Sequence, residues 1–390
     1  STGLQVIDIG MVPTPVLYYA ASEASDGTGV MLTGSHNPPD YNGFKMMLGG
    51  ETLAGETIQS LRRRVEQSEF ATGNGGYQTA NVLGNYTKRI TSDVKVSRPL
   101  KVVVDCGNGV AGAIAPQLYR ELGCEVTELY CEVDGNFPNH HPDPSQPQNL
   151  RDLIEAVRTQ RADVGFAFDG DGDRLGVISS DGSVIWPDRL MMLYAADVLS
   201  RNHGAKIIYD VKCSSNLTQQ IWEKGGEPLM WKTGHSLIKA KLKESGALLA
   251  GEMSGHIFFK ERWYGFDDAL YAGARLLEIL ANDLRAPRVV FAGLPDAANT
   301  PELRVDLPEG EHFRFMEQLM DKVEFADASV IMIDGIRADW ADGWGLVRAS
   351  NTTPSLILRF EGKDDEALKK VQNRFRKLLL EIDPALNLPF

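Results

Sequence analysis

The residues Thr33-Gly-Ser-His-Asn-Pro-Pro-Asp-Tyr-Asn-Gly-Phe-Lys45 form a polar loop between two apolar segments. Residues 29–32 before the loop predict a buried strand, and two prolines with an Asn-Gly pair predict a tight turn before a second strand over 44–48. Ser35 is therefore expected at the loop tip with His36 beside it. A serine hydroxyl is a poor nucleophile unless a neighbouring group activates it, so this pair alone carries little weight.

A second polar stretch, Asp169-Gly-Asp-Gly-Asp-Arg174, follows residues 163–168, which predict a buried strand. The alternation points three carboxylates to one side, and the glycines allow the backbone to fold around a small ion. Three negative charges this close need a cation, or one of them is partly protonated. Hard divalent ions prefer oxygen ligands, so the loop predicts a metal site that suits Mg²⁺.

Three other kinds of acidic loop share part of this pattern. An EF-hand needs a glutamate at its twelfth position, which counting from Asp169 is Ser180. An aspartyl-phosphate phosphatase also carries Asp-x-Asp-Gly after an apolar strand, and it remains the alternative mechanism. A solvated acidic turn is disfavoured because an apolar strand delivers the loop.

Two more loops carry groups suited to phosphosugars. In Gly251-Glu-Met-Ser-Gly-His256, a carboxylate and a hydroxyl at alternate positions suit neighbouring sugar hydroxyls. In Arg348-Ala-Ser-Asn-Thr352, a guanidinium, hydroxyls and loop amides suit a phosphate group. The second loop therefore predicts a cradle for a phosphate.

In this order the four loops resemble the signature loops of the α-D-phosphohexomutase family, most closely its bacterial phosphomannomutase/phosphoglucomutase branch. The likeness covers essentially the whole chain. It implies an α/β protein with three similar α/β mixed-sheet domains and a C-terminal α+β domain around a central cleft. The expected domains, which carry the phosphoserine, metal, sugar-recognition and phosphate-binding loops in turn, are 1–80, 81–183, 184–295 and 296–390.

The resemblance also implies roles for individual residues. Ser35 is expected to carry a phosphoryl group in the resting enzyme, and Arg174 to reach towards it. The expected metal ligands, for one Mg²⁺ per chain, are Ser35, Asp169, Asp171 and Asp173. The expected catalytic residues are Ser35, Lys45, His36, His256 and Arg174. The expected substrate-binding residues are Lys212, Gly234, His235, Glu252, Ser254, Arg348, Ser350, Asn351 and Thr352.

The implied reaction is the reversible conversion of hexose 6-phosphate and hexose 1-phosphate, for mannose and glucose, through a hexose 1,6-bisphosphate. Its products would supply precursors of polysaccharide and lipopolysaccharide. Met253 differs from the glutamine expected of the phosphoglucosamine branch, which favours neutral hexoses. A sugar-phosphate-binding or regulatory protein without catalysis is the alternative, and the intact Ser35, Lys45 and aspartates argue against it.

Composition narrows the class of protein. A chain of 390 residues predicts two to four domains. The net charge of -13 argues against nucleic-acid binding. The resemblance implies a monomer whose partners are small phosphosugars. No apolar run is long enough for a membrane span, and no export signal opens the chain. Four scattered cysteines are typical of reduced thiols in a cytoplasm.

The chain also shows an internal repeat. Residues 101–105 and 206–210 each begin with lysine and end with aspartate, and each is followed by a small polar loop and an amphipathic helix. This predicts a duplicated α/β unit. Prolines and small residues predict a linker over 287–300. By resemblance, about 70 further residues are expected before the first domain, which is short for a domain.

Overall fold

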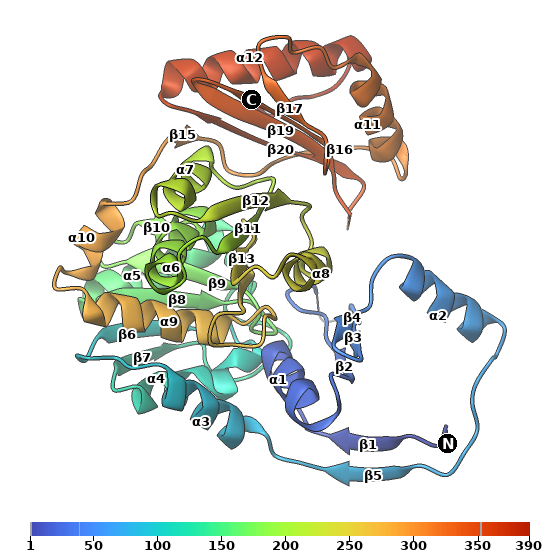
Figure 1. Ribbon diagram of the computed structural model, residues 1–390, viewed down its shortest axis with the longest axis vertical. Helices are drawn as coiled ribbons and strands as arrows, with labels where there is room; N and C mark the ends of the chain where they lie inside the picture. Colours follow the sequence, from blue (N-terminus) through green and yellow to red (C-terminus); the bar gives the residue numbers. More distant parts are fainter. Residues whose placement is uncertain (1, 39, 352) are drawn as a thin grey trace.

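Residues 2–38, 40–351 and 353–390 are described by a computed structural model, in which successive segments of the chain form separate sheets (Figure 1). In the N-terminal segment, β1 pairs with β5 in parallel, and β2, β3 and β4 form an antiparallel sheet. Its elements are β1 (Gln5–Asp8), α1 (Thr14–Ala24), β2 (Gly29–Leu32), β3 (Phe44–Leu48), β4 (Glu51–Thr52), α2 (Glu56–Glu66) and β5 (Gly76–Thr79).

The strand predicted at 29–32 is confirmed as β2, but the prediction that this strand is buried is wrong. Val30 is 60% and Leu32 is 61% exposed, because α1 packs on one face of this sheet and these two side chains project from the other. A row of apolar residues predicted the strand but not the number of covered faces.

The second segment has the sheet order β10-β9-β8-β6-β7, in which β6, β7 and β8 are parallel and β9 is antiparallel to β8. Its elements are α3 (Leu83–Asp93), β6 (Lys101–Asp105), η1 (Val110–Ala113), α4 (Ala115–Glu121), β7 (Glu125–Leu129), η2 (Pro147–Leu150), α5 (Arg151–Gln160), β8 (Val164–Phe168), β9 (Leu175–Ser179) and β10 (Val184–Ile185). The strand that delivers the acidic loop, β8, is buried throughout, as predicted.

The third segment repeats this design with the order β12-β11-β13-β14, in which β11, β12 and β13 are parallel and β14 is antiparallel to β13. The two lysine-led strands, β6 and β11, occupy the same place in their sheets, which confirms the predicted repeat. The elements are α6 (Pro187–Arg201), β11 (Lys206–Asp210), α7 (Ser215–Glu223), β12 (Glu227–Trp231), α8 (His235–Ser245), β13 (Leu249–Gly251), β14 (Ile257–Phe259) and α9 (Ala269–Asn282).

The predicted linker over 287–300 is wrong in part, because it contains α10 (Pro287–Ala292) and the short strand β15 (Ala298–Asn299). Proline stands at the first position of α10, where its missing N–H leaves no hydrogen bond unmade. Val290 and Phe291 of α10 are buried in the core that the second and third segments share, and α10 contacts β9, so this segment does not span open solvent.

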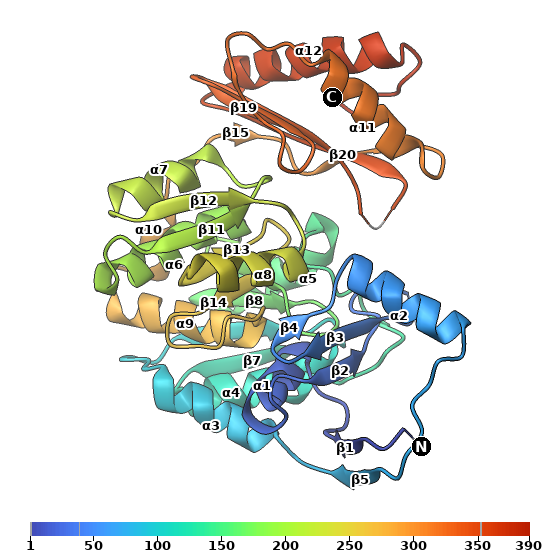
Figure 2. The same ribbon diagram turned by 45° about the vertical axis from the view of Figure 1, so that its right-hand side comes forward.

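The C-terminal segment is an antiparallel sheet with α11 and α12 on the face turned away from the rest of the molecule (Figure 1 and Figure 2). On the opposite face, Trp344 and Leu346 pack with Val211 of the third segment. The elements are β16 (Leu303–Asp306), α11 (Glu311–Lys322), β17 (Ser329–Ile331), β18 (Ile336–Trp340), β19 (Gly343–Ala349), β20 (Ser355–Gly362) and α12 (Asp365–Ile382). In the described part of the chain, none of the helices has the length and apolar character needed to cross a membrane.

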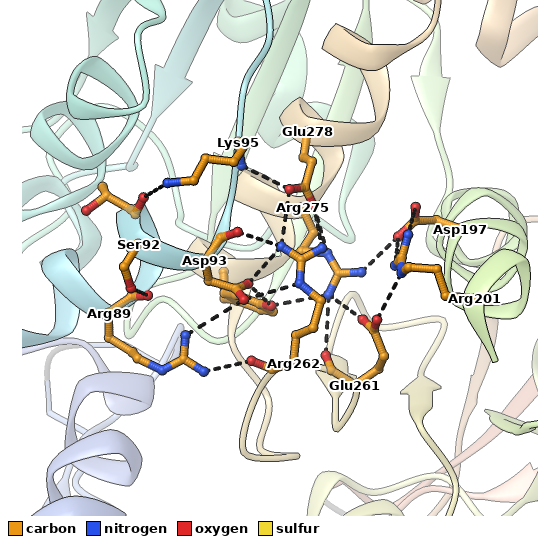
Figure 3. Close-up of polar contacts among 12 residues, drawn as sticks. Arg89, Ser92, Asp93, Lys95, Asp197, Arg201, Glu261, Arg262, Arg275 and Glu278 are labelled. Atoms are coloured by element: carbon orange, nitrogen blue, oxygen red, sulfur yellow. Dashed lines mark hydrogen bonds and ion pairs between the residues drawn. The ribbon is translucent and has the colours of Figure 1, made fainter.

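A network of buried and half-buried ion pairs joins the second segment to the third (Figure 3). Arg275 on α9 is fully buried and lies 2.8 Å from Asp197 and 2.9 Å from Glu261. Arg262 joins Asp93 of α3, at 3.1 Å, to Glu278 of α9, at 2.8 Å. Because α3 belongs to the second segment and α9 to the third, this network fixes the acidic loop of one relative to the sugar-recognition loop of the other.

We expect Arg275→Met to destabilise the chain strongly. The variant leaves Asp197 and Glu261 with only the partly exposed Arg201 as a cation, and removing one partner of a buried ion pair typically costs about 3–5 kcal/mol. Arg201→Met is the matched control, since Arg201 binds the same Asp197 and Glu261 but is 41% exposed. Its loss should cost about 1 kcal/mol or less. Thermal unfolding of both variants checks this, and equal shifts in Tm would contradict it.

Candidate active site

Ser35 lies at the tip of the first loop with the backbone in the left-handed region, at φ +52°. Its Oγ lies 2.8 Å from Asp169 Oδ2 and 3.0 Å from Asp171 Oδ1. Gly170 makes this approach possible, because a Cβ at that position would lie 2.0 Å from the Ser35 carbonyl oxygen. The first and second loops, predicted separately, therefore meet at the serine.

The three aspartates of the acidic loop are buried, and each offers one oxygen within a 4.8 Å cluster. The single proton of Ser35 can be donated to only one of the two carboxylates that it faces. Burial, together with the charges of Asp173 and Asp171, raises the pKa of Asp169 to about 6. The three carboxylates outnumber the one ammonium that pairs with them, that of Lys45, and these oxygen donors fit a hard divalent cation, which Ser35, Asp169, Asp171 and Asp173 would hold.

Lys45 stands on the other side of the cluster, on β3. Its Nζ lies 2.7 Å from Asp171 Oδ2 and 2.5 Å from Asp173 Oδ2. Burial disfavours the ammonium, but the charges of Asp171 and Asp173 outweigh this and raise the pKa of Lys45 well above its usual range. Lys45 is therefore a fixed positive charge and a donor at neutral pH.

The third loop joins the second through His256. Its Nε2 lies 3.3 Å from Asp173 Oδ1 and its Nδ1 lies 3.0 Å from Glu252 Oε2. Arg174 and His256 pair as an isolated β-bridge, which places the Arg174 Nε 3.3 Å from His256 Nε2. Burial opposes protonation of His256, but the Asp173 charge and the bond to Glu252 help raise its pKa to about 9.

The remaining predicted sugar-binding residues gather beside His256. Ser254 Oγ lies 2.9 Å from His256 Nδ1, and the backbone N–H of Gly234 donates to Glu252 at 2.5 Å. His235 stacks on His256 with ring centroids 5.6 Å apart. Burial and then the charge of the neighbouring Lys239 lower the pKa of His235, so this imidazole is neutral while His256 is charged.

Lys212 and Arg348 supply positive charge where the third and C-terminal segments meet. Lys212 Nζ donates to Glu302 Oε2 at 2.9 Å. The charge of Lys212 lowers the pKa of Glu302 against the effect of burial, and Arg348 acts in the same direction. Arg348 Nε donates to Asp334 at 3.0 Å, and the same carboxylate oxygen accepts from the Thr233 N–H at 2.9 Å.

The predicted phosphate cradle is only partly covered by the described residues. Arg348 and Ser350 are buried and Asn351 is exposed. Thr352, also predicted to bind substrate, lies outside the described residues.

His36, predicted to be catalytic, lies beside Ser35, with its Nδ1 3.1 Å from Ser35 Oγ.

Several supporting residues were missed by the sequence analysis. Thr14 Oγ1 donates to Asp171 Oδ2 at 2.7 Å, and Thr33 Oγ1 donates to the same oxygen at 3.2 Å. Thr33 lies two residues before Ser35 and could have been suspected, whereas Thr14 has no signal beyond starting a helix after a proline. Asp210 and Asp334 hold loop backbone near Lys212 and Arg348, and only the folded structure shows this.

A serine in contact with two members of a carboxylate cluster that could hold a metal ion, beside a fixed ammonium, suits a metal-assisted phosphoryl-transfer enzyme. Four domain families match the chain in order. They are described as phosphoglucomutase/phosphomannomutase alpha/beta/alpha domain I (residues 1–72), domain II (84–182) and domain III (186–296) and the C-terminal domain (302–378). The chain belongs to the phosphoglucomutase/phosphomannomutase family of α-D-phosphohexomutases.

Similarities to individual proteins over the whole of this chain agree with the family assignment. The chain is 57% identical to a phosphomannomutase/phosphoglucomutase of Pseudomonas aeruginosa, covering 100% of this chain and 84% of that protein. It is 56% identical to a phosphoglucomutase of Neisseria gonorrhoeae, covering 100% of this chain and 85% of the relative. A crystal structure of a phosphoglucomutase/phosphomannomutase family protein from Burkholderia thailandensis is 55% identical and superposes with a TM-score of 0.94, covering 100% of this chain and 85% of that one.

Proposed function

We propose that this chain catalyses the reversible conversion of hexose 6-phosphate and hexose 1-phosphate, for mannose and glucose, with Ser35 as the phosphoryl carrier. The contact of Ser35 Oγ with Asp169 and Asp171 carries the proposal, since it brings a hydroxyl from one domain to the predicted metal ligands of another. Family membership and the named relatives support the reaction class.

In the proposed reaction, the phosphoryl group on Ser35 Oγ passes to the free hydroxyl at C1 or C6 of the bound sugar phosphate. The hexose 1,6-bisphosphate then turns end for end, and its other phosphoryl group returns to Ser35. Mg²⁺ bound by Ser35 and the three aspartates would withdraw charge from the transferring group. Since little covalent chemistry is needed, the chain mainly positions the groups and balances their charge.

The charged residues around Ser35 take distinct parts in this proposal. Lys45 and His256 are both held protonated, so they serve as donors and fixed charges, not as bases. Arg174, whose Nε lies 3.3 Å from His256 Nε2, adds positive charge at the same place. His36 is the predicted catalytic residue whose ring nitrogen contacts Ser35 Oγ, and it can exchange a proton with that oxygen.

The other loops would bind the part of the sugar phosphate that does not react. Glu252 and Ser254 are proposed to bind sugar hydroxyls, next to Gly234 and His235. Lys212 and the loop of Arg348, Ser350, Asn351 and Thr352 are proposed to bind the phosphate that stays. Glu302 holds Lys212 in the substrate-free arrangement, so an entering anion would replace a carboxylate, not water.

We further propose a cytoplasmic monomer that supplies sugar 1-phosphates for polysaccharide and lipopolysaccharide precursors. All four cysteines are free thiols in the structure, which supports a reducing compartment. Sedimentation of the purified chain at several concentrations tests the monomer, and a mass that rises with concentration would contradict it.

Mass spectrometry of the purified chain distinguishes the proposed mutase from its two alternatives. We expect an added mass of one phosphate, mapped by peptide analysis to Ser35. A phosphatase that uses the acidic loop would instead trap phosphate on Asp169. A binding protein without catalysis would carry none after incubation with glucose 1,6-bisphosphate, and would release no glucose 6-phosphate from glucose 1-phosphate.

We expect the rate to fall on the alkaline side with the loss of one proton from His256. Its pKa is raised to about 9, so the imidazolium is present below that pH and is lost as the pH rises through it. Log kcat/KM measured from pH 6 to 10 should decline above about pH 9. In His256→Gln the rate should be lower and this decline should disappear. An unchanged alkaline limb in the variant would assign the titration to another group.

A further inference from the structure

Two of the four cysteines lie side by side behind the acidic loop. Cys106 directly follows β6, and Cys131 lies two residues beyond the neighbouring parallel strand β7. Their Sγ atoms are 3.5 Å apart, and the Cys131 thiol also lies 3.4 Å from the carbonyl oxygen of Val104. By contrast, the thiol of Cys213 points to the carboxylate of Asp210, at 3.2 Å.

The two thiols differ in their access to solvent. Cys106 is fully buried, and burial raises the pKa of its thiol well above the usual range. Cys131 is half-buried, so it is the one of the two residues that solvent touches. If Cys131 is oxidised, the neighbouring Cys106 is in place to resolve it as a disulfide.

The loop after Cys106 packs directly on the acidic loop. The Val110 N–H donates to the Gly170 carbonyl oxygen at 3.0 Å, and a Cβ at Gly109 would lie 2.8 Å from that same oxygen. Gly170 in turn touches the backbone of Ser35, where a Cβ would lie 2.0 Å from the carbonyl oxygen. Cys106 is therefore linked to the serine by close backbone contacts, so a displacement of the loop after Cys106 is passed on to the acidic loop and to Ser35.

The segment that carries Cys131 is held against the same loop. The Asn108 N–H donates to the Tyr130 carbonyl at 2.8 Å, and the Asp134 N–H donates to the Asn108 carbonyl at 3.0 Å. A Cβ at Gly112 would lie 2.1 Å from the Cys131 carbonyl oxygen. Shortening the sulfur–sulfur distance to a covalent bond of about 2.05 Å must therefore be absorbed in the loop between Cys106 and Val110.

We propose that Cys106 and Cys131 form a site of reversible oxidation, at which a hydroperoxide converts the two thiols into a disulfide that slows phosphoryl transfer at Ser35. The Cys131 sulfur attacks the peroxide oxygen, the O–O bond breaks, and the thiol proton leaves with the alcohol product, or with water from hydrogen peroxide. The Cys106 sulfur then attacks the resulting sulfenic sulfur, and water leaves.

In total the two thiols lose two electrons and two protons, and the hydroperoxide is reduced. A dithiol reverses the change by thiol–disulfide exchange. Disulfides in a reducing compartment are typically transient and redox-sensing, which fits a pair that is free in the structure. The slowed transfer rests on the function proposed above, whereas formation of the disulfide does not.

The test uses the full chain loaded with magnesium and treated with hydrogen peroxide. Free thiols are then alkylated, and the peptides are analysed by mass spectrometry without reduction. We expect a cross-link between Cys106 and Cys131, a severalfold loss of mutase rate, and recovery of both with dithiothreitol. Cys131→Ser should show no cross-link and keep its rate under the same treatment. Cys124→Ser, the matched control at a buried thiol outside the pair, should behave like the unchanged chain.

Three outcomes would overturn the proposal. One is alkylation of both Cys106 and Cys131 after oxidation, with no cross-linked peptide. Another is a cross-link with no change in rate. The third is an equal loss of rate in Cys131→Ser, which would place the sensitive group elsewhere. If the chain had no mutase activity at all, the mass spectrum would still show whether the disulfide forms. Failure of the proposed mutase function can therefore be told apart from failure of the proposed oxidation site.

Discussion

Ser35→Ala is expected to reduce turnover by about 10³-fold or more. Removing a covalent nucleophile abolishes the whole reaction path, whereas most substitutions in a site remove only one contact. The Oγ of Ser35 lies within hydrogen-bond distance of Asp169, Asp171 and the ring of His36, and the alanine methyl group cannot carry a phosphoryl group. The measurement is the steady-state conversion of glucose 1-phosphate to glucose 6-phosphate, in the presence of glucose 1,6-bisphosphate.

The matched control is Ser22→Ala on α1, whose hydroxyl donates to the Tyr18 carbonyl away from the acidic loop. It should retain the full rate. Binding of the sugar phosphate to Ser35→Ala should persist, because Glu252, Lys212 and Arg348 lie on other loops. Full turnover by Ser35→Ala would exclude the phosphoserine path, whatever the other loops bind.

Asp171→Asn is expected to have the second largest effect. Asp171 is the centre of the site, since its carboxylate accepts from Thr14 and Lys45 and lies 3.0 Å from Ser35 Oγ. The amide keeps the size of the side chain but loses its charge and replaces an acceptor oxygen with a donor. We expect the Mg²⁺ concentration for half-maximal rate to rise by about 100-fold or more, since even partners of metal ligands typically account for 10–100-fold.

Asp181→Asn serves as the control for Asp171→Asn. It lies in the turn between β9 and β10, where it accepts from the Ser183 N–H. Its Mg²⁺ dependence should match that of the unchanged chain. Identical magnesium titrations for Asp171→Asn and the unchanged chain would remove Asp171 from the ligand set. In that case the acidic loop would have a different role.

Much of the fold follows from local patterns in the sequence. The predicted strand over 44–48 is β3 at the same bounds, and the predicted strand over 206–210 is β11. These predictions succeed because strand and turn preferences act over a few residues. The prediction of a linker over 287–300 failed in part, because a six-residue helix such as α10 is too short to show a clear period.

The candidate site was predictable to the extent that its chemistry is concentrated in short loops. Asp169, Asp171 and Asp173 lie within five residues of the sequence, so their clustering follows from the alternation with glycine. Asp210 and Asp334 were missed because a lone aspartate after a strand or in a turn is common in any protein. Their roles depend on partners in other parts of the chain, such as Thr233 for Asp334.

By itself, the sequence determined which chemical groups are available: a serine at a turn, three carboxylates after an apolar strand, and two polar loops further on. The tertiary structure decided which of them touch, because contacts such as that of Ser35 with Asp169 join residues that are 134 positions apart. It also decided the charge of each group, since burial and neighbouring ions hold His256 protonated and His235 neutral. Charge and proximity are properties of the packed chain, and no local pattern of residues encodes them.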